Sequence, residues 1–102
     1  MAENERRKQG RAMRRKLMGD EYADNLDGSV YRGPIMEKFA EVTQECIFGA
    51  LWTRPGLDLK TRTLICVISD AATGRDPELK LHLRFALNQG WTEDELSEAL
   101  LH

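Results

Sequence analysis

Residues 58–90 decide the fold class, and they read DLKTRTLICVISDAATGRDPELKLHLRFALNQG. Asp58 can cap a helix, because an aspartate side chain accepts hydrogen bonds from the first helical turn. Gly74 can end that helix, since glycine readily takes the positive φ of a C-terminal cap. The first part of the stretch therefore predicts a helix that follows Asp58 and runs to about Thr73.

The second part of the stretch predicts another helix. Asp76, Pro77 and Glu78 provide a capping carboxylate, a proline suited to the first helical position and an acid favoured by the helix dipole. This helix reaches Gln89, and Gly90 stops it. No punctuation typical of strands is present, so the stretch indicates an all-α protein.

Both helices carry apolar side chains over most of their circumference. These side chains belong to Leu64, Ile65, Val67, Ile68, Ala71, Leu79, Leu81, Leu83, Phe85 and Leu87. A helix that is apolar nearly all round must be covered on more than one side. Five short helices in 102 residues cannot easily cover both, so we expect an oligomer.

Helices are predicted on both sides of this stretch. Residues 3–18 form a first helix, with Gly19 where a left-handed cap would end it. Residues 20–33 are acidic, contain glycine and lack periodicity, so we expect a loop with at most a short helical turn. Thr92 and Glu95 form a capping box that opens a last helix, which is still apolar at His102.

Residues between that loop and the central stretch predict a further helix. Pro34 suits its first position, and Ile35, Phe39, Val42 and Cys46 recur at the spacing of one buried stripe. Residues 52–57 then break this helix, because they contain a proline followed by a glycine.

The composition favours one globular domain of an intracellular protein. Apolar residues make up 41% and charged residues 31% of the chain. The longest apolar stretch, residues 64–72, is far shorter than the roughly 20 residues of a membrane span. The N-terminus lacks the apolar region of a secretory signal, so we expect a cytoplasmic protein that inserts into no membrane. Cys46 and Cys66 have no CxxC spacing, which favours small core residues over a redox pair or zinc site.

The charge distribution is uneven. Residues 1–16 contain seven Lys and Arg against Glu3 and Glu5, whereas the rest of the chain contains eight against fifteen acids. Such a basic arm can touch nucleic acid. Packing on the acidic body or on a neighbouring subunit is the simpler use, because nucleic-acid binding needs a wider basic surface. We therefore expect no nucleic-acid partner.

One face of the helix after Gly74 combines groups that could transfer protons. Glu78, His82, Phe85 and Gln89 fall at i, i+4, i+7 and i+11. Imidazole exchanges a proton near neutral pH, and an acid one turn away can orient it. The pair of Glu78 and His82 is therefore either an acid/base site or an ion pair on the helix surface.

Arginines at positions 54, 62, 75 and 84 bracket the same region. A guanidinium group is well matched to a substrate carboxylate, although most arginines are simply solvated. Arg54 adjoins a rigid Pro-Gly turn and Arg62 lies early in an apolar helix, so these two are the better candidates. The sequence contains no glycine-rich phosphate loop, metal-ligand cluster or nucleophile elbow. We therefore expect chemistry without a metal or other cofactor.

Several motifs together resemble a known family. They are ALWTRPGL over residues 50–57, KTRTL over 60–64, ELKLHLR over 78–84 and NQG over 88–90, with a similar stretch over 10–20. They resemble the carboxymuconolactone decarboxylase family over nearly the whole chain. The resemblance implies an all-α, AhpD-like bundle of about five to six helices, as a single domain over residues 1–102 that lacks the family's final helix. It also implies a homo-oligomer, either a hexamer or a trimer.

The resemblance implies an activity as well. The expected reaction is cofactor-free decarboxylation of 4-carboxymuconolactone to 3-oxoadipate enol-lactone, or of a related carboxylated lactone, in protocatechuate catabolism. His82 would be the proton donor and Glu78 its orienting partner or a second acid. Arg54 and Arg62 would clamp the carboxylate. Two aromatic residues, Trp52 and Phe85, are further candidates for substrate binding.

Two alternatives are left open. Peroxidase accessory proteins of the AhpD type carry a CxxC pair before the histidine, but those positions hold Arg75 and Glu78, so thiol chemistry is disfavoured. A diverged member could instead bind or convert another small keto or lactone metabolite. Trp91 and Phe85 could reshape a pocket for such a substrate, or could equally be core residues.

Overall fold

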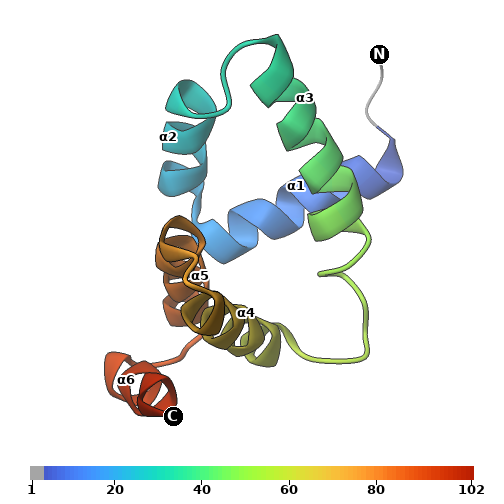
Figure 1. The fold of residues 1–102 in the computed structure, drawn as a ribbon. Helices are drawn as coiled ribbons and strands as arrows, with labels where there is room; N and C mark the ends of the chain where they lie inside the picture. Colours follow the sequence, from blue (N-terminus) through green and yellow to red (C-terminus); the bar gives the residue numbers. More distant parts are fainter. Residues whose placement is uncertain (1–3) are drawn as a thin grey trace. The chain divides into compact units, whose positions relative to one another are not determined.

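The computed structural model describes residues 4–102, and these form six α-helices and one π-helical segment, with no strand among them (Figure 1). The all-α prediction is confirmed. The chain divides into two compact units, Met1–Pro55 and Gly56–His102. None of the helices in the described part of the chain has the length and hydropathy needed to span a membrane.

Helix α1, Glu5–Met18, ends at the predicted residue, but the glycine that follows it does not take the predicted conformation. The Asn4 side chain caps it by accepting a hydrogen bond from the backbone of Arg7, and the expected start at Glu3 lies outside the described residues. Gly19 follows with φ 88° and ψ 148°. This is an extended conformation open essentially to glycine alone, so the predicted left-handed cap is wrong in geometry although a glycine is required.

Residues 20–33 are not the predicted loop. Helix α2, Asp20–Ser29, occupies most of them. Asp20 and Glu21 in its first turn complement the helix dipole, and Ala23 is completely buried. The loop prediction failed because α2 has little apolar periodicity of its own and depends on contacts with α1.

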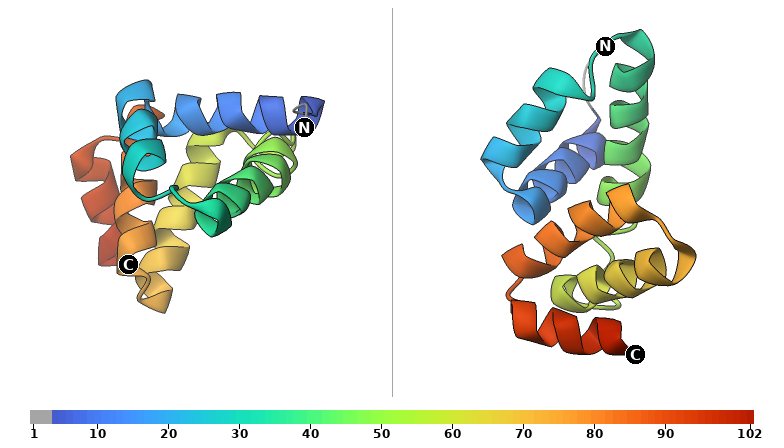
Figure 2. Two further views of the ribbon diagram at one scale, coloured as in Figure 1. Left: turned by 90° about the horizontal axis from the view of Figure 1, so that it is seen from above. Right: turned by 60° about the vertical axis from the view of Figure 1, so that its left-hand side comes forward.

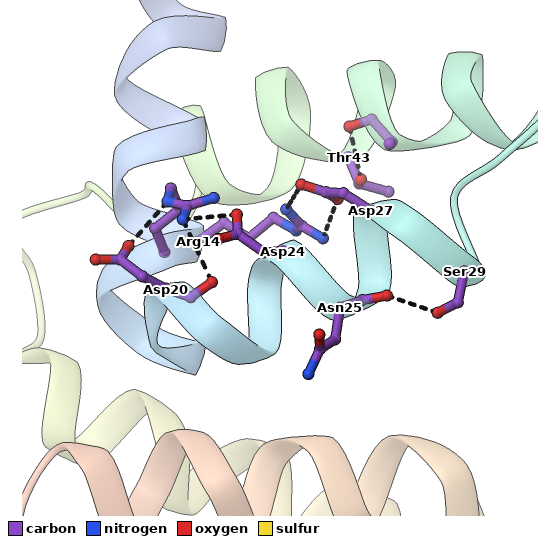
Figure 3. Close-up of polar contacts among 9 residues, drawn as sticks. Arg14, Asp20, Asp24, Asn25, Asp27, Ser29 and Thr43 are labelled. Carbon is purple, nitrogen blue, oxygen red and sulfur yellow. Dashed lines mark hydrogen bonds and ion pairs between the residues drawn. The ribbon is translucent and has the colours of Figure 1, made fainter.

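Those contacts are ion pairs between two helices (Figure 3). The buried Arg14 guanidinium donates to Asp27 at 2.9 Å and lies 5.2 Å from the centre of the Tyr31 ring. Arg15 donates to Asp20 and to Asp24, each at 2.9 Å. The basic residues of α1 therefore pack on the acidic residues that follow, as the uneven charge distribution led us to expect.

Helix α3, Pro34–Thr43, continues as the π-helix η1, Gln44–Gly49. Proline lies in the first turn as predicted, but the predicted buried stripe is wrong. Ile35, Phe39 and Val42 are 78%, 52% and 58% exposed, and Cys46 is exposed rather than a core residue. The spacing identified one apolar face of the helix correctly, but no neighbouring element in the described chain buries it.

The buried side of this segment includes the contact of η1 with α1. The buried set is Ala40, Gln44 and Gly49. A Cβ atom added to Gly10 would lie 1.6 Å from the Gln44 carbonyl oxygen, and one added to Gly49 would lie 2.3 Å from the Arg6 carbonyl oxygen. The backbones of α1 and η1 therefore touch, and glycine at both positions permits this.

The second unit matches its sequence signals more closely. Helix α4, Leu59–Thr73, begins after Asp58, which accepts a 2.7 Å hydrogen bond from the Thr61 backbone. That hydrogen bond holds the pKa of Asp58 below its usual value. Gly74 ends α4 in the left-handed conformation, with φ 71° and ψ 31°. The predicted bounds of this helix are confirmed.

Helices α5 and α6 complete the unit. Helix α5, Asp76–Asn88, is preceded by Arg75 at the N-cap position, so Asp76 is the first helical residue and not the predicted cap. Helix α6, Glu93–Leu101, carries the predicted capping box, in which Thr92 and Glu95 exchange two hydrogen bonds.

Helices α4 and α5 lie side by side, as the views of Figure 2 show, and α6 packs on α4. Their common core consists of Val67, Ala86 and Leu96, with Leu64, Leu79, Leu83 and Trp91 packed against it. The Trp91 indole donates a 2.8 Å hydrogen bond to the Lys60 carbonyl oxygen, and the Lys60 ammonium lies 4.4 Å from the ring centre. Trp91 is therefore part of the packing of this unit.

Candidate active site

The α4–α5 pair joins an imidazole to a carboxylate. His82, in the second turn of α5, shares a hydrogen bond between its Nδ1 and the Oδ2 atom of Asp70. The two side chains are 22% and 9% exposed. Glu78, which the sequence suggested as the partner of His82, is exposed one turn earlier on α5. The imidazole is therefore held by an acid from the neighbouring helix.

Asp70 lies where helix stability does not favour an acid. It is in the last turn of α4, where the helix dipole disfavours negative charge. Burying a carboxylate also costs free energy unless it is paired and hydrogen-bonded. His82 provides that partner. Helix propensity does not explain an acid at this position, whereas its pairing with His82 does.

Phe85 packs against the same imidazole. Its ring centre lies 5.3 Å from that of His82, with the ring planes at 72°, and Phe85 itself is fully buried. A phenyl ring placed edge to face restricts the orientation of the imidazole. The structure thus brings together two of the sequence-predicted site residues, His82 and Phe85, and adds Asp70.

Cys66 lies one helical turn before Asp70 on α4. Burial raises the pKa of its thiol, and the negative charge of Asp70 raises it further. A raised pKa keeps this sulfur as the less reactive thiol at neutral pH. Cys66 is half-buried, and its surroundings do not activate a nucleophile.

The other predicted site residues are distributed over both units. Arg62 lies on α4, where its Nε donates a 3.1 Å hydrogen bond to the Leu57 carbonyl oxygen. It precedes Asp70 by eight residues, or about 12 Å along a helix axis. Trp52 is buried and stacks with Phe48 at 6.4 Å between ring centres, and the Arg54 side chain is exposed. Trp52 and Arg54 belong to the first unit and Arg62 to the second.

A pocket in the second unit lies apart from this group. It is lined by Ile68, Ala71, Ala72, Ala99, Leu100 and His102. Most of these residues are apolar, and none of them is an arginine or lysine that could pair with a carboxylate. Within residues 4–102, no group of three or more His, Cys, Asp or Glu side chains could hold a metal ion.

Sequence reasoning missed Asp70 because it searched for a partner of His82 along the same helix. One signal was available, since Ser69 and Asp70 interrupt the apolar stretch of residues 64–72. A lone acid in the last turn of an apolar helix breaks a local rule, and such violations concentrate at functional sites.

The chain is similar in sequence to proteins of one family. Residues 37–102 match the model of the carboxymuconolactone decarboxylase family. The whole chain is 33% identical to a 4-carboxymuconolactone decarboxylase from Acinetobacter baylyi and covers 75% of it. Over 94 residues, 92% of the chain, it is 36% identical to nitrosuccinic acid decarboxylase npaB from Metarhizium robertsii and covers 64% of that protein. No solved structure matches the chain.

Proposed function

Since the chain belongs to the carboxymuconolactone decarboxylase family, we propose that it is a decarboxylase of a small carboxylated metabolite, with 4-carboxymuconolactone as the first candidate substrate. The observation that carries this proposal is the His82–Asp70 pair, which lies inside the region matched by the family. A partly exposed imidazole held by a buried carboxylate can supply a proton in a fixed direction.

The substrate itself supplies the electron sink for this reaction. In 4-carboxymuconolactone the carboxylate is on a saturated ring carbon that the ring double bond links to the lactone carbonyl, so a carbanion at this carbon is conjugated with that carbonyl. When the bond to the carboxylate breaks, CO2 leaves and the electron pair moves to the carbonyl oxygen as a dienolate. A proton added to carbon then completes 3-oxoadipate enol-lactone. The protein has to bind the carboxylate, stabilise the dienolate oxygen and deliver one proton.

These tasks can be divided among the candidate residues. His82 delivers the proton, and Glu78, exposed on the same helix, is a second acid. Arg62 and Arg54 bind carboxylates, because a guanidinium group offers paired donors to the two oxygens. Phe85 is fully buried against His82, so it acts on the imidazole and does not contact the substrate. A substrate contact of Trp52, which is buried in the first unit, stays a prediction from the sequence.

A second substrate is favoured by the relative named nitrosuccinic acid decarboxylase. A nitro group beside the reacting carbon can accept the electron pair left by CO2 and form a nitronate, so it serves the same purpose as the lactone carbonyl. The proton donor and carboxylate-binding groups required are the same for both acids. We therefore propose the coarser class, an acid whose carboxylate is on a carbon that carries an electron-withdrawing group directly or is linked to one through a double bond.

The test is a direct comparison of the two acids. The purified protein is mixed with 4-carboxymuconolactone or with nitrosuccinate, and both the ultraviolet absorbance and the released CO2 are followed. We expect CO2 release from at least one acid, and the ratio of the two kcat/KM values identifies the better substrate. If the protein releases CO2 from neither acid, the proposed function is wrong.

Arg62→Lys should raise KM for the carboxylated substrate by about tenfold, although the positive charge is kept. A lysine ammonium cannot offer the paired donors of the guanidinium, and it also lacks the Nε that binds the Leu57 carbonyl oxygen. Steady-state kinetics of the folded variant measure the change. Arg84→Lys, on the exposed side of α5, is the matched control. Wild-type KM in Arg62→Lys would show that Arg62 does not bind the substrate.

We also propose that the protein is a homo-oligomer, most simply a trimer or hexamer. The support is the apolar face of α3, formed by Ile35, Phe39 and Val42, which the described chain leaves exposed. A surface of this kind in a folded protein indicates an interface. Obligate interfaces of this type bury about 2,000 Å² or more.

We expect the protein to elute well above its monomer mass of 11.7 kDa and to become more stable as its concentration rises. Val42→Ser should shift the elution toward smaller species, whereas Lys38→Ser, a polar position of α3, should not. Size-exclusion chromatography with light scattering measures both effects. A wild-type monomer at micromolar concentration would contradict the proposal.

A further inference from the structure

We propose that Asp70 is a positioning residue, which holds His82 in the tautomer that leaves Nε2 directed to the substrate. This inference rests on the proposed function and deepens it. Asp70 touches no substrate in this account. It acts through the imidazole.

The hydrogen bond between Asp70 and His82 determines which ring nitrogen carries the proton. An ionised carboxylate is an acceptor only, so when Oδ2 of Asp70 bonds Nδ1 of His82, the proton must lie on Nδ1. In a neutral imidazole only one nitrogen carries hydrogen. Nε2 is therefore the nitrogen that gains and loses the catalytic proton.

The surroundings of the ring keep this arrangement in place. Asp70 is buried on α4, His82 projects from α5, and Phe85 packs edge to face on the imidazole one turn later. The carboxylate fixes one edge of the ring and the phenyl group restricts its tilt. Rotation of the imidazole by half a turn would leave the Asp70 carboxylate buried without its partner, which is strongly unfavourable.

The proton transfer is balanced with this tautomer. The protonated imidazole carries hydrogen on both nitrogens, and Nε2 gives its proton to the dienolate carbon. The ring is left neutral with Nδ1–H still bonded to Asp70, and Nε2 takes a proton from solvent before the next turnover. The carboxylate also complements the positive charge of the imidazolium.

The experiment combines kinetics with a spectroscopic measurement of the ring. In tag-free protein labelled with 15N at histidine, the imidazole nitrogen shifts report which nitrogen carries hydrogen. The chain has two histidines, so His102→Gln assigns the signals. The variants are Asp70→Asn and Asp70→Glu. Asp76→Asn, an exposed Asp of α5, is the matched control.

We expect neutral His82 to be the Nδ1–H tautomer in the wild-type protein and in Asp76→Asn. In Asp70→Asn the amide can donate to Nδ1, so the tautomer should shift toward Nε2–H. The kcat should fall about tenfold to a hundredfold while KM changes little. Asp70→Glu keeps a carboxylate acceptor, so it should recover part of the Nδ1–H population and part of the wild-type kcat.

Two results would overturn the inference. One is an Nε2–H tautomer of His82 in the wild-type protein. This measurement needs neither an active variant nor a substrate. The other is an unchanged kcat in folded Asp70→Asn. If no tested acid is decarboxylated at all, the proposed function fails separately, while the tautomer of the wild-type ring still decides whether Asp70 sets its orientation.

Discussion

Replacing His82 by Asn should lower kcat by about 10²–10⁴-fold, the usual contribution of a positioned proton donor. The side chain lies on α5 against Asp70 and Phe85, and imidazole is the side chain that exchanges a proton near neutral pH. Asn is preferred to Ala because its amide can still donate to the buried Asp70 carboxylate. The loss then reports the missing proton and not an unpaired buried charge.

The measurement is steady-state kinetics on the better of the two candidate acids, with circular dichroism and elution volume recorded for each variant. His102→Asn is the matched control, because His102 follows the last helix and is exposed. We expect the control to retain wild-type kcat. Near-normal turnover by folded His82→Asn would remove His82 from the mechanism.

Gly10→Ala should destabilise the protein by about 3 kcal/mol or more, the upper part of the range for overpacking. The added Cβ would lie 1.6 Å from the carbonyl oxygen and 2.7 Å from the carbonyl carbon of Gln44. Both are backbone atoms of η1, so no side-chain rotation relieves the clash. Helix α1 would have to move away from η1, its main contact in the first unit.

Gly28→Ala provides the control for this prediction. Gly28 lies in α2 and has no atom within 4 Å of an added Cβ, so alanine there should stabilise by about 0.5–1 kcal/mol through helix propensity. Chemical denaturation at one fixed protein concentration gives both free energies of unfolding. If Gly10→Ala unfolds within about 1 kcal/mol of wild type, the described contact between α1 and η1 is wrong.

Sequence reasoning succeeded where the signal was local. Asp58, Gly74 and the Thr92–Glu95 capping box each determine a helix end through hydrogen bonds or φ values within a few residues. Helix α2 was missed because the ion pairs of Arg14 and Arg15 on α1 hold it, and these depend on how two helices pack.

The buried stripe of α3 failed for a related reason. Periodicity identifies which residues share a helix face, but it does not say whether another element covers that face. The buried side carries Ala40, Gln44 and Gly49, and glycine at positions 10 and 49 lets the backbones of α1 and η1 touch. The buried side of this segment is therefore the one that packs closely on α1, and not its apolar face.

The sequence indicated the imidazole of the candidate site but not the carboxylate that bonds it. His82 was identified from its residue type and from the motif around it, but Asp70 lies twelve residues earlier on another helix. Their contact depends on the turn at Gly74 and on the packing of α4 against α5. The spacing along a single helix face therefore indicates Glu78 instead.

In the proposed reaction this chain removes CO2 from a carboxylated acid and then delivers one proton to carbon. The most direct test is a reaction with 4-carboxymuconolactone in D2O, without added metal or nucleotide, followed by CO2 measurement and NMR of the product. We predict one CO2 released per lactone consumed and one deuterium added to a single face of the product carbon. Consumption of the lactone with its carboxylate retained, or deuterium distributed equally over both faces, would contradict the account.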